Sequence, residues 1–224
     1  MIPTGGWAKV ARMSAYPIGY EADFVEERSR LTTFFRYFLA IPLWIVGIIW
    51  AIGGVVCVVI AWFALLFTGK YPDGLYAYNL GVNRYFTRVG GYMRLLTDVY
   101  PPFDTGEHTE YPIRLPASGP LESYSRVKVF FRYFLAIPVI LINYALNILG
   151  NIAALLSWFV ILFTGKQSSG LQDAGNLATA YGARLSAYMG LLTETWPPFS
   201  PSENMPPATA PPAAEPPAPP AETP

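Results

Sequence analysis

The sequence has few of the side chains from which catalytic and metal sites are built. It contains one cysteine and one histidine among 224 residues, and its 15 basic residues balance its 15 acidic ones. The single cysteine, Cys57, can form no intramolecular disulfide and supplies no cysteine-based metal site. A balanced charge gives no strongly basic field, so nucleic-acid binding is not expected.

The other reactive groups are poorly placed for catalysis. His108 lies in Glu107-His-Thr-Glu110, where an imidazole between carboxylates could touch a metal but is more typical of a solvated loop. The sequence FTGK at Phe67–Lys70 lacks the earlier glycine of a phosphate-binding loop. The serines have no histidine base within the same unit of the chain. We therefore predict no enzymatic activity, no cofactor and no metal site.

Charged side chains are absent from two long apolar runs. No Asp, Glu, Lys or Arg occurs from Tyr37 to Phe67 or from Tyr133 to Phe163. The 53% hydrophobic content and the mean hydropathy of +0.32 are high for a soluble globular chain. Runs of this length and polarity are typical of membrane segments, so we predict an integral membrane protein. The usual ion-coupling carboxylate of a transporter is missing from both runs.

The two runs belong to a tandem duplication. FFRYFLAIP at Phe34–Pro42 returns at Phe130–Pro138 with all nine positions identical. FTGK returns at Phe163–Lys166, at the same offset of 96 residues. A constant offset indicates two copies of one unit. The predicted segments are a flexible N-terminus, repeat one, a linker, repeat two and a disordered Pro/Ala-rich tail, at residues 1–15, 16–103, 104–110, 111–199 and 200–224.

Each copy is predicted to be all-α apart from a short extended segment before its run. Apolar and polar residues alternate from Ile18 to Phe24, and a fragment of that alternation recurs at Ile113–Leu115, so the two segments could pair. After each run, a stripe of apolar residues with helical spacing predicts an amphipathic helix. We expect these helices to lie in the membrane interface with their aromatic side chains inward. The alternative is that both stripes pack on the runs as ordinary core.

The path of each run through the membrane is open to two interpretations. As one helix, the 31 residues from Tyr37 to Phe67 would measure about 46 Å, against a hydrocarbon core of about 30 Å. A single tilted span, bent at Pro42, fits that length better than a hairpin with arms of about 23 Å. A hairpin would instead place all 15 basic residues on one side of the membrane. We favour the hairpin because of this charge distribution.

Basic side chains flank both runs at matching positions. They are Arg36 and Lys70 in the first copy and Arg132 and Lys166 in the second. Aromatic neighbours suit the headgroup level, so we predict that these side chains anchor the runs to lipid headgroups. A specific contact with an anionic lipid is the alternative.

Three asparagines lie within the second run. Asn143, Asn147 and Asn151 recur every four residues and therefore share one face of a helix. Hydrogen bonding between helices is the expected role, and a polar pore lining is the alternative.

The repeated pattern resembles a known family. Its parts are FFRYFLAIP, then AWFALLFTGKYPDGL at Ala61–Leu75, then a segment that ends in LLTDVYPPF. This pattern is similar to a bacterial membrane-domain family known as domain of unknown function 4389, which often occurs in tandem. The resemblance covers Tyr16 to Phe199, although the second copy has Gln-Ser-Ser after Lys166 where the family has Tyr-Pro. It implies residence in a membrane and provides no catalytic residue.

These observations predict a multi-pass protein of the bacterial inner membrane with its tail in the cytoplasm. A non-enzymatic scaffold or accessory subunit is the favoured function. A small channel, a transporter or a lipid-handling protein is the alternative. The expected partner is the lipid bilayer, and anionic lipids, other membrane proteins or a second copy of the chain are further candidates.

Overall fold

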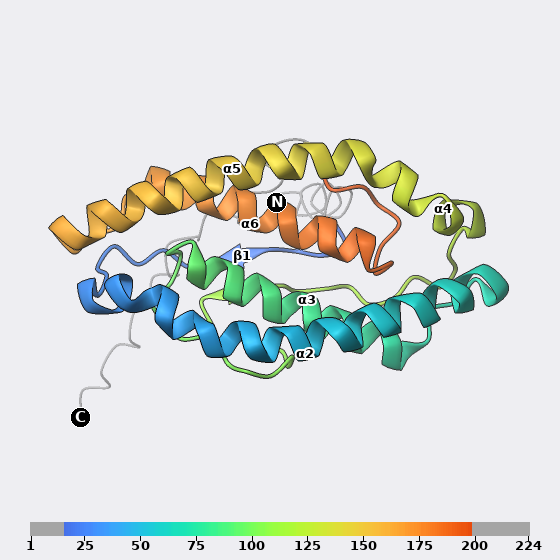
Figure 1. Ribbon diagram of the computed structural model, residues 1–224. Helices are drawn as coiled ribbons and strands as arrows, with labels where there is room; N and C mark the ends of the chain where they lie inside the picture. Colours follow the sequence, from blue (N-terminus) through green and yellow to red (C-terminus); the bar gives the residue numbers. More distant parts are fainter. Residues whose placement is uncertain (1–15, 199–224) are drawn as a thin grey trace, which may run out of the picture.

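The computed structural model describes residues 16–198 (Figure 1). The predicted flexible N-terminus and disordered tail lie outside these residues. The described elements, in chain order, are β1 (Glu21–Ala22), α2 (Arg30–Thr68), α3 (Asp73–Met93), β2 (Ile113–Arg114), α4 (Arg126–Phe130), α5 (Arg132–Thr164) and α6 (Ser169–Met189).

Each apolar run forms one continuous helix. α2 has 39 residues and α5 has 33, which correspond to about 58 Å and about 50 Å. The hydroxyl of Ser29 caps the start of α2, and Gly69 ends it in the left-handed conformation with a φ of 71°. Pro42 stays inside the helix. The favoured hairpin is therefore wrong, because neither run reverses direction.

Glycines near the middle of each run serve close packing instead of a turn. A Cβ atom added at Gly150 of α5 would lie 2.5 Å from the Cβ atom of Ala178 in α6. At Gly53 of α2, an added Cβ would overlap the hydroxyl oxygen of Tyr78 in α3. The missing side chains let each long helix approach the helix that follows it.

The two long helices run antiparallel along opposite edges of the molecule, and α3 and α6 lie between them (Figure 1). Their ends meet through matching tryptophans. Trp62 Nε1 donates to the carbonyl oxygen of Val129, and Trp158 Nε1 donates to that of Thr33, both at 3.2 Å. Because the donors and the acceptors occupy equivalent positions in the two copies, the copies are inverted about an approximate twofold axis.

The extended segments before the runs are exchanged between the copies. β1 pairs with β2 in antiparallel fashion, with Glu21 opposite Arg114, so the pairing that the sequence left open is present. The carbonyl oxygen of Ile18 accepts a hydrogen bond from Arg184 of α6 at 3.3 Å. The carbonyl oxygen of Leu115 accepts one from Arg84 of α3 at 3.2 Å. Each copy thus uses its leading segment to cover the second helix of the other copy.

The second helix of each copy is core. On α3 the aromatic stripe is buried, and so are polar residues that an interfacial helix would turn outward, among them Asn79, Asn83 and Thr87. Asn83 Nδ2 donates to the carbonyl oxygen of Ala183 of α6 at 3.0 Å. The structure therefore shows the alternative of packing as core, and the expected position in the membrane interface stays a prediction.

Arg36 and Arg132 point into the protein. Arg36 is 2% exposed, and its Nη1 atom donates to the carbonyl oxygens of Tyr92 at 2.5 Å and Thr97 at 2.7 Å. Its Nη2 atom pairs with Asp98, and its guanidinium lies 4.3 Å from the centre of the Tyr92 ring. These contacts close the end of α3, where backbone carbonyls lack helical partners and the helix dipole is negative.

The second copy repeats this arrangement. Arg132 is fully buried, donates to the carbonyl oxygen of Thr193 at 2.7 Å and stacks 4.2 Å from the centre of the Tyr188 ring. The predicted headgroup anchoring by Arg36 and Arg132 is therefore wrong. Sequence alone could not place α3 and α6 against the inner face of the long helices, and that packing decides which way the arginines point.

The structure predicts that Arg36 contributes strongly to stability. Arg36→Met would remove the buried ion pair with Asp98 and the hydrogen bonds to two carbonyl oxygens, so we expect a loss of about 3–5 kcal/mol in the free energy of unfolding. Arg36→Lys should lose less, because lysine keeps the charge but lacks the planar fork. Thermal unfolding of the purified protein measures both effects. Lys166→Met is the control, since its ion pair with Glu26 is exposed, and equal melting temperatures for the two methionine variants would contradict this role.

Candidate functional site

The outward faces of α2 and α5 form a large apolar surface. Phe38, Ile49 and Phe67 of α2 are 69%, 65% and 75% exposed, and Phe134 and Phe163 of α5 are 72% and 78% exposed. Both helices are long and apolar enough to cross a membrane, and little of their most apolar stretches is buried. They therefore differ from the core helix of a soluble protein. Exposed apolar surface of this extent marks an interaction surface.

The flanking lysines lie apart from the arginines with which the sequence grouped them. Lys70 is exposed, and Lys166 is exposed and pairs with Glu26 at 2.9 Å. The four basic residues proposed as anionic-lipid contacts thus separate into two buried arginines that bind backbone carbonyls and two exposed lysines.

Of the three asparagine side chains, that of Asn147 has hydrogen bonds within the protein. Asn147 Oδ1 accepts a hydrogen bond from Arg94 Nη2, and Asn147 Nδ2 donates to the carbonyl oxygen of Asn143 at 2.8 Å. Asn143 is partly buried, and its Oδ1 atom has no hydrogen-bond partner among the described residues. Asn151 is exposed on α5. The structure therefore brings Asn143 and Asn147 to the interface between the copies and leaves Asn151 outside it.

A polar cavity of about 240 Å³ lies where the two copies meet. Its walls come from α3, α5 and α6 together with the residue that follows α3, Arg94. Arg94 is its only charged lining residue. The polar side chains around it are Asn83, Thr87, Asn143, Asn147, Thr179 and Ser186.

Arg94 has only neutral partners in this cavity. Besides the bond to Asn147, its Nη1 atom donates to Thr179 Oγ1 at 3.2 Å, and its Nε atom is buried without a partner. The ion pairs of residues 16–198 include no carboxylate for Arg94. Burial lowers the pKa of the guanidinium, opposed by the Tyr20 hydroxyl. Within residues 16–198, the site therefore holds a cation without a counter-charge.

Sequence reasoning missed Arg94, although a signal for it exists. The stretch YMRLLTD in the first copy corresponds to YMGLLTE in the second, so Arg94 matches Gly190. A charged residue that is present in only one copy cannot have a structural role that both copies require. That asymmetry could have drawn attention to Arg94 before the structure was available.

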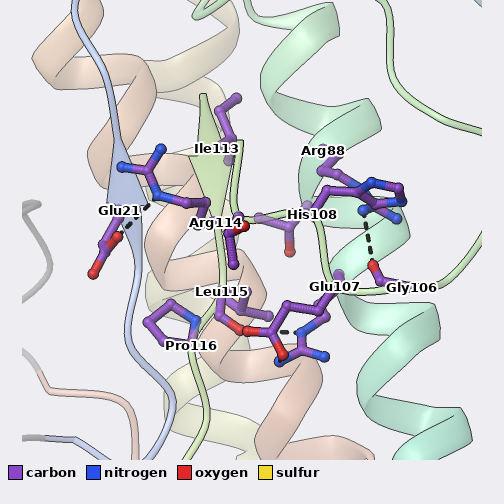
Figure 2. Close-up of a pocket in the computed structure, with 12 residues that line it drawn as sticks. Glu21, Arg88, Gly106, Glu107, His108, Ile113, Arg114, Leu115 and Pro116 are labelled. Atoms are coloured by element: carbon purple, nitrogen blue, oxygen red, sulfur yellow. Dashed lines mark hydrogen bonds and ion pairs between the residues drawn. The ribbon is translucent and has the colours of Figure 1, made fainter. Parts of the chain in front are cut away.

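A second cavity, of about 120 Å³, lies between the linker and α3 (Figure 2). Its cations all have partners within the protein. Arg84 pairs with Glu107 at 2.8 Å, and Arg88 donates to the carbonyl oxygen of Gly106 at 2.9 Å. Arg114 pairs with Glu21 at 3.0 Å, as Figure 2 shows. These bonds hold the linker and the exchanged strands against α3.

The histidine of the linker does not join the carboxylates that flank it in sequence. His108 Nε2 lies 2.8 Å from Asp104 Oδ1, and this hydrogen bond lowers the pKa of Asp104. Within residues 16–198, no group of three or more His, Cys, Asp or Glu side chains is placed to hold a metal ion.

The contacts of Asn147 and Asn151 predict different mutational effects. Asn147→Leu removes an acceptor from a buried guanidinium, so we expect the free energy of unfolding to fall by about 1–3 kcal/mol. Asn151→Leu, the matched control on the same helix, should change it by less than about 0.5 kcal/mol. Thermal unfolding in detergent compares the two. A loss of the same size for both variants would contradict the interface role of Asn147.

Comparison with known families is consistent with the duplication. The family model described as domain of unknown function (DUF4389) matches residues 30–104 and again residues 126–200. The first match begins with α2 and the second with α4, so each includes a long helix and the helix that follows it. No curated protein and no solved structure matches the chain.

Proposed function

Starting from the fact that the chain belongs to the DUF4389 family through both of its copies, we propose that it is a non-enzymatic protein of the bacterial plasma membrane. It acts there as a scaffold or an accessory subunit. The observation that carries the proposal is the apolar outward surface of α2 and α5. Exposing this surface to water costs free energy, whereas contact with lipid acyl chains does not. The polar side chains of α3, in contrast, find partners inside the protein.

We propose further that α2 and α5 lie along the membrane surface with their outer faces in one leaflet. Tyr85 of α3 donates to the carbonyl oxygen of Leu43 at 2.6 Å, and Val82 packs at Gly54. Arg84, between them in sequence, is therefore level with about residue 50 of α2. At 1.5 Å per residue, that level is about 20 Å from Tyr37 and about 26 Å from Phe67.

A helix that crossed the membrane would carry these charges near the bilayer centre. The side chain of Glu107, which pairs with Arg84, is 55% exposed, and that of Glu21 is 44% exposed. Ionised groups facing hydrocarbon at that depth are costly. An in-plane position leaves them in water and keeps the basic residues on one side, which was the charge argument for the hairpin.

Two equivalent glycines test this arrangement. Gly74 and Gly170 lie near opposite ends of the long helices, and a side chain added at either meets no atom within 4 Å. Gly74→Cys and Gly170→Cys are made singly in a Cys57→Ser background, and intact cells are treated with a membrane-impermeant maleimide. In-plane helices give the same labelling at both positions, whereas one span per copy gives opposite labelling. The protein should also stay in the membrane pellet after a carbonate wash, and its release would contradict membrane residence.

A channel or lipid-handling protein is the second candidate function. It is favoured by the inverted copies and by the polar cavity between them. Under the scaffold proposal, liposomes that contain the reconstituted protein release no more trapped solute than protein-free liposomes do. Release above that level that is abolished by Asn147→Leu, but not by Asn151→Leu, would contradict the scaffold and establish a channel.

A further inference from the structure

We infer that the Arg94 cavity binds the phosphate group of an anionic lipid whose acyl chains lie beside α2 and α5. The inference rests on the proposed membrane residence. It replaces the flanking arginines and lysines, which the sequence suggested as lipid contacts, with a residue that has no counterpart in the second copy.

The charge at the cavity requires a counter-ion. A buried cation is stabilised by an anion or by several hydrogen bonds, and leaving it with neutral partners alone is costly. Arg36 and Arg114 pair with carboxylates. The buried Arg28, Arg88 and Arg132 donate to backbone carbonyl oxygens. Arg94 differs from both groups, because it lines a cavity and its hydrogen-bond partners are two neutral side chains. No carboxylate among residues 16–198 balances this charge, so a bound anion would supply the missing negative charge.

The unused hydrogen-bonding groups match a phosphate. The Nε–H of Arg94 is a donor without a partner among the described residues, and Ser186 is an exposed hydroxyl at the cavity. Arginine binds phosphate oxygens through parallel N–H donors. A water occupies about 30 Å³, so about 240 Å³ holds a phosphate group together with waters.

The position of the cavity favours a lipid as the source of the phosphate. Phe86 of α3, which lines the cavity, lies 3.3 Å from a Cβ atom built at Gly47 of α2. Asn143 and Asn147 line it from α5. The cavity is thus close to both helices that carry the apolar surface, so a headgroup could enter it while the acyl chains stay beside those helices.

The inference is tested by lipid-dependent thermal unfolding of the full-length protein in a non-ionic detergent. We expect phosphatidylglycerol to raise the melting temperature in a saturable manner. Phosphatidylcholine and inorganic phosphate should not do so at the same concentrations. Arg94→Gln should weaken the response to phosphatidylglycerol by roughly 10- to 100-fold. Arg126→Gln, which removes an exposed arginine outside the cavity, should leave the response unchanged.

Each result decides between alternatives. An unchanged response in Arg94→Gln overturns the site, and an equal response to inorganic phosphate overturns the lipid as the source. If Arg94→Gln does not fold, native mass spectrometry of the wild-type protein decides, because retention of one phosphatidylglycerol per chain is expected and retention of none overturns the inference. Carbonate washing is scored separately. Loss of the lipid site with membrane residence retained therefore rejects this inference alone.

Discussion

A buried guanidinium at the end of a helix holds each copy of this protein together. In the first copy, Arg36 of the long helix binds carbonyl oxygens on both sides of the turn that follows α3. That turn contains Leu95 with a φ of 63°, and Leu191 repeats it with a φ of 64°. A left-handed leucine costs roughly 1–2 kcal/mol, so the turn persists only because other contacts fix it. The arginine thus stabilises the helix end and the reversal of the chain together.

Because each long helix turns its arginine into the protein, the outer faces of α2 and α5 carry no charge along their apolar runs. The sequence FFRYF places its single arginine among rings, and the fold turns the arginine inward while Phe34, Phe35 and Phe38 stay exposed. Arg36 and Arg132 bind backbone carbonyl oxygens inside the protein. Apolar atoms are left for the surface, in reverse of the arrangement usual in soluble proteins.

Local patterns predicted the parts of the fold that depend on neighbouring residues. The duplication, both long apolar segments, the helices after them and the short paired strands were all visible in the sequence. The direction of Arg36 and the unbroken course of α2 were not, because both depend on where α3 packs. The distribution of the basic residues suggested a hairpin, although the run contains no turn sequence. That distribution bears on how a protein is oriented in a membrane and does not determine where its backbone turns. The role of Arg94 could have been recognised only by comparing the two copies for positions at which they differ.

The exchange of leading segments connects this fold to oligomers. A chain holding one copy would have to pair with a second chain, each covering the other's α3-like helix, to complete the same structure. Joining two copies turns that association into an intramolecular step with a high effective concentration. It also allows the two copies to differ in sequence. In a symmetric pair, both chains would carry an arginine at the position of Arg94, whereas the fused chain keeps one and has Gly190 at the equivalent position. Covalent linkage is thus what permits a site whose arginine is present in one copy only.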